Sequence, residues 1–489
     1  MFHISDLKKY NRCKRLFLLD YLGEPSPFQN FVRLDDEVSM LAAKKLGIQE
    51  YFLGERNDPH VRAMNALDSY EWLIKARFEY KNLRIKVPFM HKTKKGYDLY
   101  FLFLGLYPKA HDIQYYCATV FVLQKLGFQL NDFYLVHLNE GYCRKGELNV
   151  DELFVVSDSF YNENKNPTKN IKETIMHSLV DLDGTLNEME EALSKPIEEP
   201  IRKPRCASRQ KCIHYNECFE EETFEDNSIL TLSASQHRYA MRQNGIKYLK
   251  DADLDLVEGS RLQFAQIMAD KNGGLFYDKH ALKAWMSEIQ YPISFIDFEW
   301  ECYAIPPYDG MHPYDVLPFE YSLHILHEDG HVDHKVFLSI HDDRREFAEN
   351  LIHDVANKGT VMAYNAFGAE QLRMQELAAY MPDLSKDLYD ICDRLKDLQI
   401  PFVNGLVYNV KQKGFCSLKQ IMSTMDDEGY EDLGIKQGME AVFQWRHLDQ
   451  NDDDVNRSKI IQDLKEYCGM DTYAMVVVVK WLNQLIQED

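Results

Sequence analysis

The pattern of hydrophobic and polar positions predicts a chain of mixed α/β structure. Apolar residues recur at helical spacing up to about Asn82 and again over His111–Leu126. Apolar runs typical of strands occupy Tyr97–Tyr107 and Phe133–Leu138. Residues 229–289 have a mainly helical pattern. Helices and strands therefore alternate along much of the chain, which favours an α/β fold class.

Changes in composition divide the chain into three predicted parts. Residues 1–227 form an α/β or α+β domain, which ends after the stretches SKPIEEPIRKPRC and FEEETFEDN. Residues 228–290 form a helical connector. Residues 291–489 form a last domain, which opens with the buried strand PISFIDFEW.

Composition and charge narrow the classes of function. Hydrophobic residues make up 45% of the 489 positions, which is enough for several cores. The formal net charge of −22 excludes a surface that is basic overall, as duplex DNA binding would favour. It leaves room for a local basic groove or an acidic cation site. No apolar run approaches the length of a membrane span and the N-terminus does not resemble a signal peptide, so we expect a cytoplasmic protein without membrane contact.

The most specific chemical pattern is acidic and lies in the last domain. Asp297 and Glu299 are two residues apart on the strand ISFIDFEW, and because side chains alternate along a strand, both face the same side. In the predicted helix LKEYCGMDTYAMVVVVKWL, Tyr467 and Asp471 share a face at i and i+4. Phosphoryl transfer by two ions needs such oxygen ligands around paired Mg²⁺ or Mn²⁺ about 4 Å apart. The pattern therefore predicts a two-ion site.

These motifs resemble the DEDD exonucleases of the ribonuclease-H-like superfamily, in the subclass with a tyrosine in its third motif. The phrases IDFEW, YNAFGAEQ, GYEDLGIKQGMEA and YCGMDTYAM also resemble a bacterial family in which such a nuclease follows a Cas-four-like iron–sulfur module. The resemblance implies that Asp297 and Glu299 bind metal, that Asp471 completes the first ion's shell and that Tyr467 positions the attacking water. It implies 3′ to 5′ hydrolysis of terminal phosphodiester bonds in single-stranded DNA or RNA.

The second motif departs from the spacing of that family. The acid expected four residues after the Asn of YNAF falls at Ala369, and Glu370 lies one position further on. One residue is a rotation of about 100° on a helix, so Glu370 serves only if the preceding loop absorbs an extra residue. We favour Glu370 for this catalytic role, with Asp397 as a possible substitute. Trp300 also stands where the family has a small polar residue.

Four cysteines form the candidate chemistry of the first domain. Cys13 lies in SDLKKYNRCKRLFLLDYL, and Cys206, Cys212 and Cys218 are spaced C-x5-C-x5-C. Four thiolates suit either a [4Fe–4S] cluster or Zn²⁺. This half resembles the Cas-four-like PD-(D/E)xK nuclease fold, and the resemblance implies that the four thiolates hold a [4Fe–4S] cluster. Zn²⁺ remains the alternative.

The nuclease motifs of that fold are missing from the first domain. The corresponding strands, RIKVPFM and DLYFLFLGLYPKA, carry no acid at the aspartate position and no Glu-x-Lys. We therefore predict a degenerate domain for binding or scaffolding. An alternative for the whole chain is a catalytically inactive nucleic-acid-binding or assembly protein with a partner in phage defence, CRISPR or repair.

Two further patterns are less specific. Histidines at 324, 327, 331 and 334 could bind a metal, although surface or cross-strand histidines are more common in such a hairpin. Clustered basic residues could line a nucleic-acid groove, although such clusters are often only solvated faces. These basic residues are Lys8, Lys9, Arg12, Lys14, Arg15, Lys92, Lys94, Lys95, Arg202, Lys203, Arg205, Arg209 and Lys211.

Overall fold

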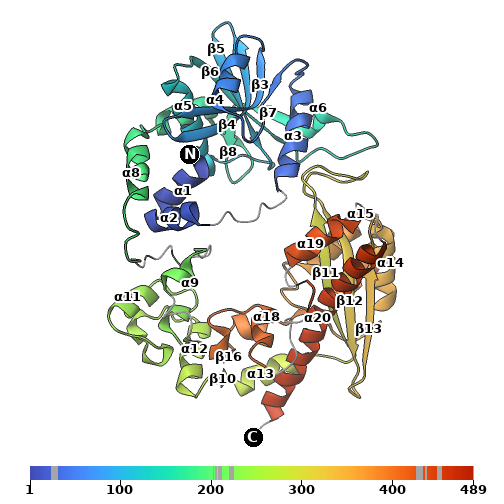
Figure 1. Cartoon of the computed structure of the whole chain (residues 1–489). Helices are drawn as coiled ribbons and strands as arrows, with labels where there is room; N and C mark the ends of the chain where they lie inside the picture. The colour runs from blue at the N-terminus through green and yellow to red at the C-terminus, as the bar shows by residue number, and fades with distance from the viewer. Residues whose placement is uncertain are drawn as a thin grey trace. The chain divides into compact units, whose positions relative to one another are not determined.

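The computed structural model divides the chain into two compact units (Figure 1). Unit 1 comprises Met1–Cys218 and Tyr303–Asp315, and unit 2 comprises Phe219–Cys302 and Val316–Asp489. The structure describes all residues except 24–30, 202, 204–205, 207–211, 220–224, 426–432, 436–437, 449–453 and 488–489. None of the helices in the described ranges is both long and apolar enough to cross a membrane.

Unit 1 is built on a mixed sheet whose described strands run in the order β2-β3-β4-β5-β6-β7, with β1 paired to β4. The strands are β1 (Phe2–His3), β2 (Phe52–Leu53), β3 (Trp72–Tyr80), β4 (Leu83–Thr93), β5 (Gly96–Phe103), β6 (Leu130–Leu138) and β7 (Phe154–Ser157). Helix α5 (Ile113–Lys125) connects the parallel strands β5 and β6 and buries its apolar side against the sheet. Helix α3 (Phe31–Lys45) contributes to a second core.

The predicted helix α5 and strands β5 and β6 are confirmed, but the helical prediction up to Asn82 is wrong in its last part. Residues 72–80, WLIKARFEY, form β3 between β2 and β4. Leu73, Ile74, Ala76 and Phe78 of this strand are all fully buried. Lys75, Arg77 and Glu79 alternate with Ala76, Phe78 and Tyr80, which is the period of a strand, so the local pattern agrees with the structure and the helical prediction misses it.

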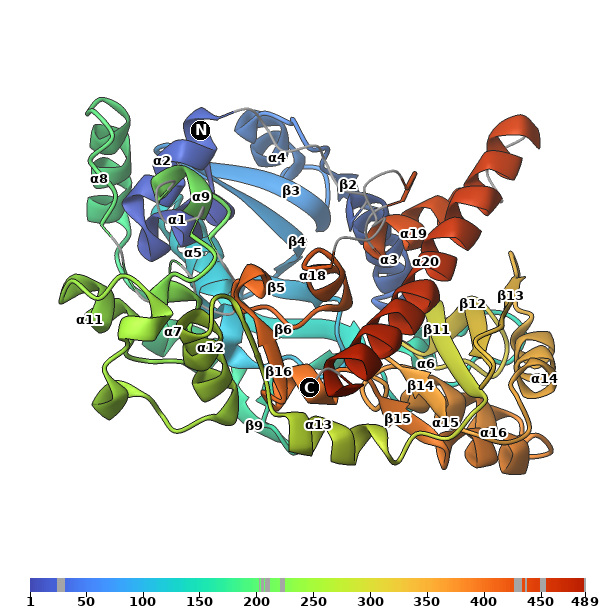
Figure 2. The ribbon, with the colours of Figure 1, turned by 90° about the horizontal axis from the view of Figure 1, so that it is seen from below.

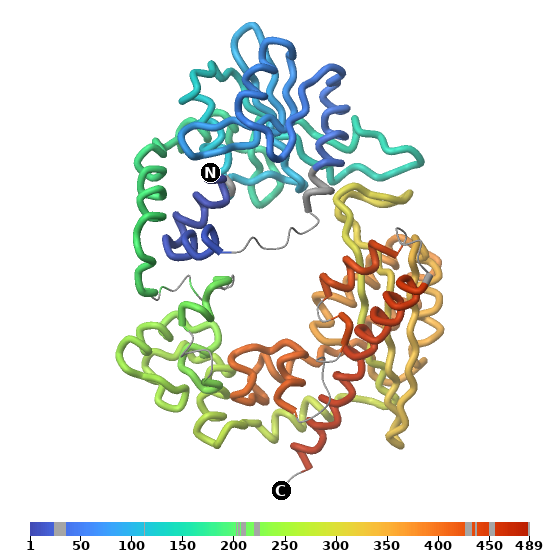
Figure 3. Tube along the Cα trace, viewed as in Figure 1, coloured from blue at the N-terminus to red at the C-terminus, as the bar shows by residue number. Residues whose placement is uncertain are grey.

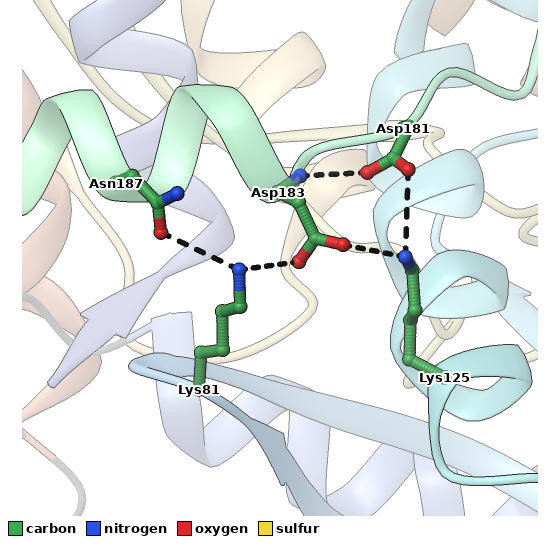
Figure 4. A network of polar contacts seen from close by, with 5 residues as sticks. All are labelled: Lys81, Lys125, Asp181, Asp183 and Asn187. Carbon is green, nitrogen blue, oxygen red and sulfur yellow. Dashed lines mark hydrogen bonds and ion pairs between the residues drawn. The ribbon is translucent and has the colours of Figure 1, made fainter.

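A polar network attaches helix α8 (Asp183–Leu193) to the rest of unit 1 (Figure 4). Lys81 Nζ lies 2.7 Å from one carboxylate oxygen of Asp183, and Lys125 Nζ lies 2.5 Å from the other. Lys81 also donates to Asn187, and Lys125 to Asp181. Hydrogen bonds from Lys125 and then Lys81 lower the pKa of Asp183 to about 2. The first residue of α8 is thus fixed between the β3–β4 turn and the end of α5.

The segment Tyr303–Asp315 belongs to unit 1, although the strands before and after it belong to unit 2. Arg144 donates its backbone N–H to Met311 O at 3.0 Å and accepts from Gly310 N–H at 2.8 Å. Ala304 is buried in the same core as α3. The other described elements of unit 1 are α1 (Ile4–Arg12), α2 (Lys14–Leu22), α4 (His60–Ala66), α6 (Val150–Leu153), β8 (Ser159–Tyr161), β9 (Pro167–Asn170), α7 (Ile171–Ser178) and α9 (Tyr215–Cys218).

Unit 2 contains a mixed sheet whose described strands run in the order β13-β12-β11-β14-β15. The strands are β11 (Ile293–Cys302), β12 (Val316–Leu326), β13 (Val332–Leu338), β14 (Val361–Ala363) and β15 (Leu395–Asp397). Strands β11, β14 and β15 are parallel, whereas β12 pairs antiparallel with both β11 and β13. The 34-residue helix α20 (Asp454–Gln487) runs along β11 and β12 (Figures 1 and 2).

Each face of this sheet has its own core. Ile293 and Phe295 of β11 pack with α20 residues on one face, whereas Ile296 and Phe298 pack with α14 (Arg344–Asp354) on the other. The chain can be followed through the remaining elements in Figure 3. They include α11 (Arg238–Gln243), α12 (Arg261–Lys271), β10 (Leu275–Tyr277), α13 (Lys279–Met286), α15 (Glu370–Tyr380), α16 (Ser385–Cys392), α17 (Ile400–Val403), β16 (Val407–Asn409), α18 (Leu418–Met422) and α19 (Gly438–Arg446).

Phe347 of α14 is predicted to be a main support of unit 2. Its ring is fully buried and lies 5.2–5.8 Å from the rings of Phe298, Tyr321 and Phe337. Phe347→Ala should lower the free energy of unfolding of unit 2 by about 3–5 kcal/mol, because it leaves a cavity that the neighbours fill only in part. Urea unfolding measures this, and Phe347→Leu should cost clearly less. Equal midpoints for wild type and Phe347→Ala would contradict the packing described.

Candidate metal centre

The acidic pair predicted on a strand lies on one face of β11. Asp297 is the direct cross-strand partner of Ser322 on β12, and Glu299 is the partner of Glu320. The pairing shifts register between Glu299 and Trp300, where the strand has an irregularity. The face that carries Asp297 and Glu299 is the one that α20 covers. Alternation along the strand therefore points both carboxylates toward one helix.

Helix α20 supplies a third carboxylate and a phenol. One oxygen each of Asp297, Glu299 and Asp471 lie within 4.8 Å of one another, and no other such group of potential metal ligands occurs in the part of the chain that the structure describes. Tyr467 lies one turn before Asp471 and is buried. Together they line a cavity of about 360 Å³. The other lining residues are Phe298, Trp300, Tyr364, Ala369, Glu370, Gly438, Met439 and Val442.

Glu370 reaches this cavity because α15 begins with it. The preceding turn places Asn365 at a φ of 61°, and Asp397 fixes that turn by accepting the Asn365 backbone N–H at 2.9 Å. Glu370 is 2% exposed, and its Oε2 has no hydrogen-bond partner among the described residues. It is not a member of the close group of three carboxylates. The loop geometry thus brings Glu370 beside the site, while Asp397 is engaged as a turn residue.

The carboxyl groups resist ionisation in this setting. Burial, followed by the charges of Asp471 and Glu370, raises the pKa of Asp297 well above its ordinary value. Burial and the charge of Asp471 raise the pKa of Glu299 to about 8, and burial raises that of Glu370 to about 8. Like charges in a poorly solvated cluster need protons or cations between them. The donor set of hard oxygens suits Mg²⁺ or Mn²⁺.

A lysine that the sequence does not signal completes the surroundings of Tyr467. Lys419 on α18 donates from Nζ to the Tyr467 hydroxyl oxygen at 3.0 Å, and this Nζ lies 4.5 Å from the ring centroid. Its charge also acts to lower the pKa of Glu299. No motif spacing relates a lysine in a short helix to a tyrosine 48 positions later. The pairing arises only when α18 packs on α20.

Two more buried groups border the acidic cluster. Glu320 is fully buried, and neither carboxylate oxygen has a hydrogen-bond partner in the described ranges. Burial and then the charge of Glu299 raise the pKa of Glu320. The thiol of Cys468 lies 3.6 Å from a carboxylate oxygen of Asp297, and burial raises its pKa. Both groups therefore favour their neutral forms in the ion-free site.

The four predicted cluster cysteines lie in unit 1 and are all partly buried. Cys212 donates its backbone N–H to Cys206 O at 2.9 Å. Arg15, two residues after Cys13, donates from Nε to the Cys218 sulfur at 3.3 Å. The segment that carries Cys206, Cys212 and Cys218 thus contacts helix α2 through Cys218. All four cysteines are among the described residues, but no three of their sulfur atoms lie within 4.8 Å of one another.

Strands β4 and β5 of unit 1, on which the sequence predicts no nuclease ligands, contribute core side chains. Val87, Phe89 and Met90 of β4 and Leu99 and Phe101 of β5 are fully buried. Asp98, near the start of β5, accepts a hydrogen bond from the Asn131 side chain at 2.8 Å and another from the Asp132 backbone N–H at 3.0 Å, and both donors lie on β6. These strands provide packing in place of ligands.

The histidine pairs have local partners. His324 and His334 are cross-strand neighbours whose rings stack 4.0 Å apart. His327 and His331 both lie within hydrogen-bond distance of Asp333. These contacts agree with the interpretation as cross-strand and surface histidines.

The predicted basic groove is only partly described. Lys9 forms an ion pair with Asp20, and Arg15 donates to the Glu198 carbonyl at 2.5 Å. These contacts engage both side chains within unit 1. Four members of the predicted groove lie outside the described residues: Arg202, Arg205, Arg209 and Lys211.

Comparison with known sequences identifies one partial match. A family described as a domain of unknown function (DUF2779) matches residues 294–417. The matched range contains Asp297, Glu299 and Glu370 but ends before Lys419, Tyr467 and Asp471. No curated protein and no solved structure matches the chain.

The raised pKa values predict how the stability of the ion-free protein depends on pH. Glu299 and Glu370 have ordinary pKa values of 4.5 and values of about 8 in the fold, so the folded state binds more protons between these limits. The contribution of these two groups to the free energy of unfolding should therefore be fully present below about pH 4.5 and be lost as the pH rises through about 8. Melting temperatures in EDTA measure this dependence.

Mn²⁺ should raise the melting temperature at about pH 8 but hardly at about pH 5, because cations replace protons in the cluster. In EDTA, the melting temperature of wild type relative to that of the double variant Glu299→Gln, Glu370→Gln should fall between pH 5 and pH 8, because the variant lacks both titrating groups. The same change in melting temperature for both proteins over this range would contradict the described burial of these carboxyl groups.

Proposed function

We propose that unit 2 is a metal-dependent 3′ to 5′ exonuclease that hydrolyses terminal phosphodiester bonds of single-stranded DNA or RNA. The observation that carries this proposal is the convergence of Asp297, Glu299 and Asp471 within 4.8 Å. The cavity beside them has room for a substrate group, and Tyr467 lines it. The mixed α/β sheet with the acidic pair on its first strand is compatible with the ribonuclease-H-like fold of the resemblance.

We propose that the site holds two divalent cations, for which the carboxylate oxygens are suitable ligands. Asp297, Glu299 and Asp471 would hold them, and Glu370, with a buried oxygen that lacks a partner among the described residues, would assist. When bound, Mg²⁺ or Mn²⁺ would neutralise charge on the phosphate and lower the pKa of the attacking water. The carboxyl groups would bind cations in place of protons only when the pH approaches their raised pKa values.

Tyr467 and Lys419 have a joint role in this proposal. A phenol has one hydrogen to donate and can accept hydrogen bonds on its oxygen. Because the Lys419 ammonium donates to that oxygen, the hydroxyl hydrogen remains available for the attacking water. The Lys419 ammonium also places a positive charge beside the carboxylate cluster, where the anionic substrate would bind. The side chain of Trp300 forms another wall of the cavity, with the guanidinium of Arg373 5.1 Å from its ring centroid.

For unit 1 we propose a binding or scaffolding role with a [4Fe–4S] cluster on Cys13, Cys206, Cys212 and Cys218. The return of the triplet to the N-terminal helices supports this proposal, since a cluster would join segments about 200 residues apart. Thiols are the softest ligands in the described part of unit 1, and they suit iron–sulfur clusters or Zn²⁺. The proposed cluster would close a long loop of the chain.

Removal of a metal ligand tests the enzyme. Asp297→Asn or Asp471→Asn should lower hydrolysis of an end-labelled single strand by about 100-fold or more, because the cations supply several kcal/mol of transition-state stabilisation. Tyr467→Phe should have a smaller effect, since it keeps all carboxylates. Glu328→Gln, in an exposed turn, is the matched control and should match wild type. Full activity in both aspartate variants would refute the assignment, and absence of hydrolysis by wild type with Mn²⁺ would favour the inactive binding protein.

The cluster has its own test. Protein purified without oxygen should be brown and carry about four iron atoms per chain. Cys212→Ser should bleach the colour and destabilise unit 1, whereas Cys143→Ser, outside the proposed set, should do neither. Colourless protein with about one zinc per chain would replace iron–sulfur by zinc at the same site. Folded protein without metal would remove the site.

A further inference from the structure

A buried polar network lies beneath the acidic cluster, between α20 and the sheet. The hydroxyl oxygen of Thr472 on α20 lies 2.8 Å from Ser322 Oγ and 2.8 Å from His324 Nδ1 on β12. Ser322 Oγ in turn lies 3.1 Å from His334 Nε2 on β13. Thr472 and Ser322 are fully buried, and His324 is 8% exposed. The helix is thus joined to two strands: its contacts with β12 are buried, whereas His334 on β13 is exposed.

One set of hydrogen positions satisfies the whole network. Gly469 O can only accept, so the Thr472 hydroxyl, 3.0 Å away, donates to it. The oxygen of Thr472 then accepts from Ser322 O–H and from His324 Nδ1–H. Ser322 accepts from His334 Nε2–H. Burial lowers the pKa of both histidines, that of His324 to about 4, so each ring is neutral at neutral pH and has one N–H to give.

The network adjoins the acidic cluster on both of its elements. Ser322 is the cross-strand partner of Asp297, and Thr472 directly follows Asp471. The helix is also close to the sheet at this point, because a Cβ on Gly469 would lie 3.3 Å from a ring atom of His334. A rotation or retreat of α20 would break the hydrogen bonds of Thr472 and move Asp471 away from Asp297 and Glu299.

We propose that Thr472 is a positioning residue of the metal centre. With Ser322, His324 and His334 it fixes the rotation and depth of α20 against the sheet, which keeps the Asp471 carboxylate close to the pair on β11. Apolar packing alone would hold the helix less specifically, since hydrogen bonds require defined directions whereas hydrophobic contacts do not. This inference rests on the proposed function, because it concerns how the same site is assembled.

The test compares Thr472→Val, which keeps the shape and removes the hydroxyl, with Thr472→Ser, which keeps the hydroxyl. Mutation of a group that orients a metal ligand typically lowers metal affinity by about 10–100-fold. We expect Thr472→Val to weaken Mn²⁺ binding, measured by calorimetry on the full chain, by about tenfold, and Thr472→Ser to restore most of it. On a single-stranded substrate, kcat should fall while KM changes little.

Two further variants separate positioning from general stability. Ser322→Ala added to Thr472→Val should cause little further loss of Mn²⁺ affinity, because both act through one network. Val478→Ala, which removes buried apolar contacts from the same helix, should lower the melting temperature but leave Mn²⁺ affinity unchanged.

The outcomes are distinguishable from failure of the proposed function. Wild-type affinity in Thr472→Val would overturn the positioning role alone. Equal losses of affinity in Thr472→Val and Val478→Ala would overturn it as well, since the effect would then follow stability. Wild-type protein that binds no Mn²⁺ would overturn the proposed function together with the site that Thr472 is proposed to position.

Discussion

The centre of unit 2 depends on one constraint, the electrostatic repulsion among its carboxylates. Two of them lie on strand β11 and the third on helix α20, which packs against that strand. Asp297, Glu299 and Asp471 are held close together in a partly buried cluster, and burial adds to the cost of their charges. Such an arrangement persists only because the surrounding fold is stable enough to impose it. The repulsion that weakens the ion-free protein is also what makes the cluster suitable for divalent cations.

The architecture of unit 2 opposes this repulsion from both sides. Strand β11 lies in the middle of the sheet, between β12 and β14, and the residues that carry its two carboxylates are paired with Ser322 and Glu320 of β12. Helix α20 comes from the end of the chain and packs over the same strand, where the thiol of Cys468 contacts Asp297 across 171 sequence positions. The centre is thus assembled only when distant parts of unit 2 are folded together.

Local periodicity was sufficient to predict part of this site. Asp297 and Glu299 share a face because strands repeat every two residues, and Tyr467 and Asp471 share one because helices repeat near four. Glu370 could not be decided from spacing, since the start of α15 depends on a turn that Asp397 stabilises from another strand. The distances between these groups also depend on packing that no local pattern encodes.

Tertiary contacts explain the other differences between sequence and structure. Lys419 and Thr472 are ordinary polar residues in sequence, and their partners lie on elements that meet only in the fold. Residues 72–80 form a strand that the helical prediction misses, although charged residues at 75, 77 and 79 alternate there with Ala76, Phe78 and Tyr80. A short alternating segment is thus easily missed within a longer stretch whose apolar residues recur at helical spacing.

Diffraction from crystals soaked in MnCl₂, collected at a wavelength where manganese scatters anomalously, tests the central claim most directly. The account predicts anomalous peaks among the carboxylates of Asp297, Glu299 and Asp471, and none at this place in crystals of Asp297→Asn soaked in the same way. A wild-type crystal at about pH 8 with no manganese among these three side chains would contradict the claim that the cluster is a metal centre.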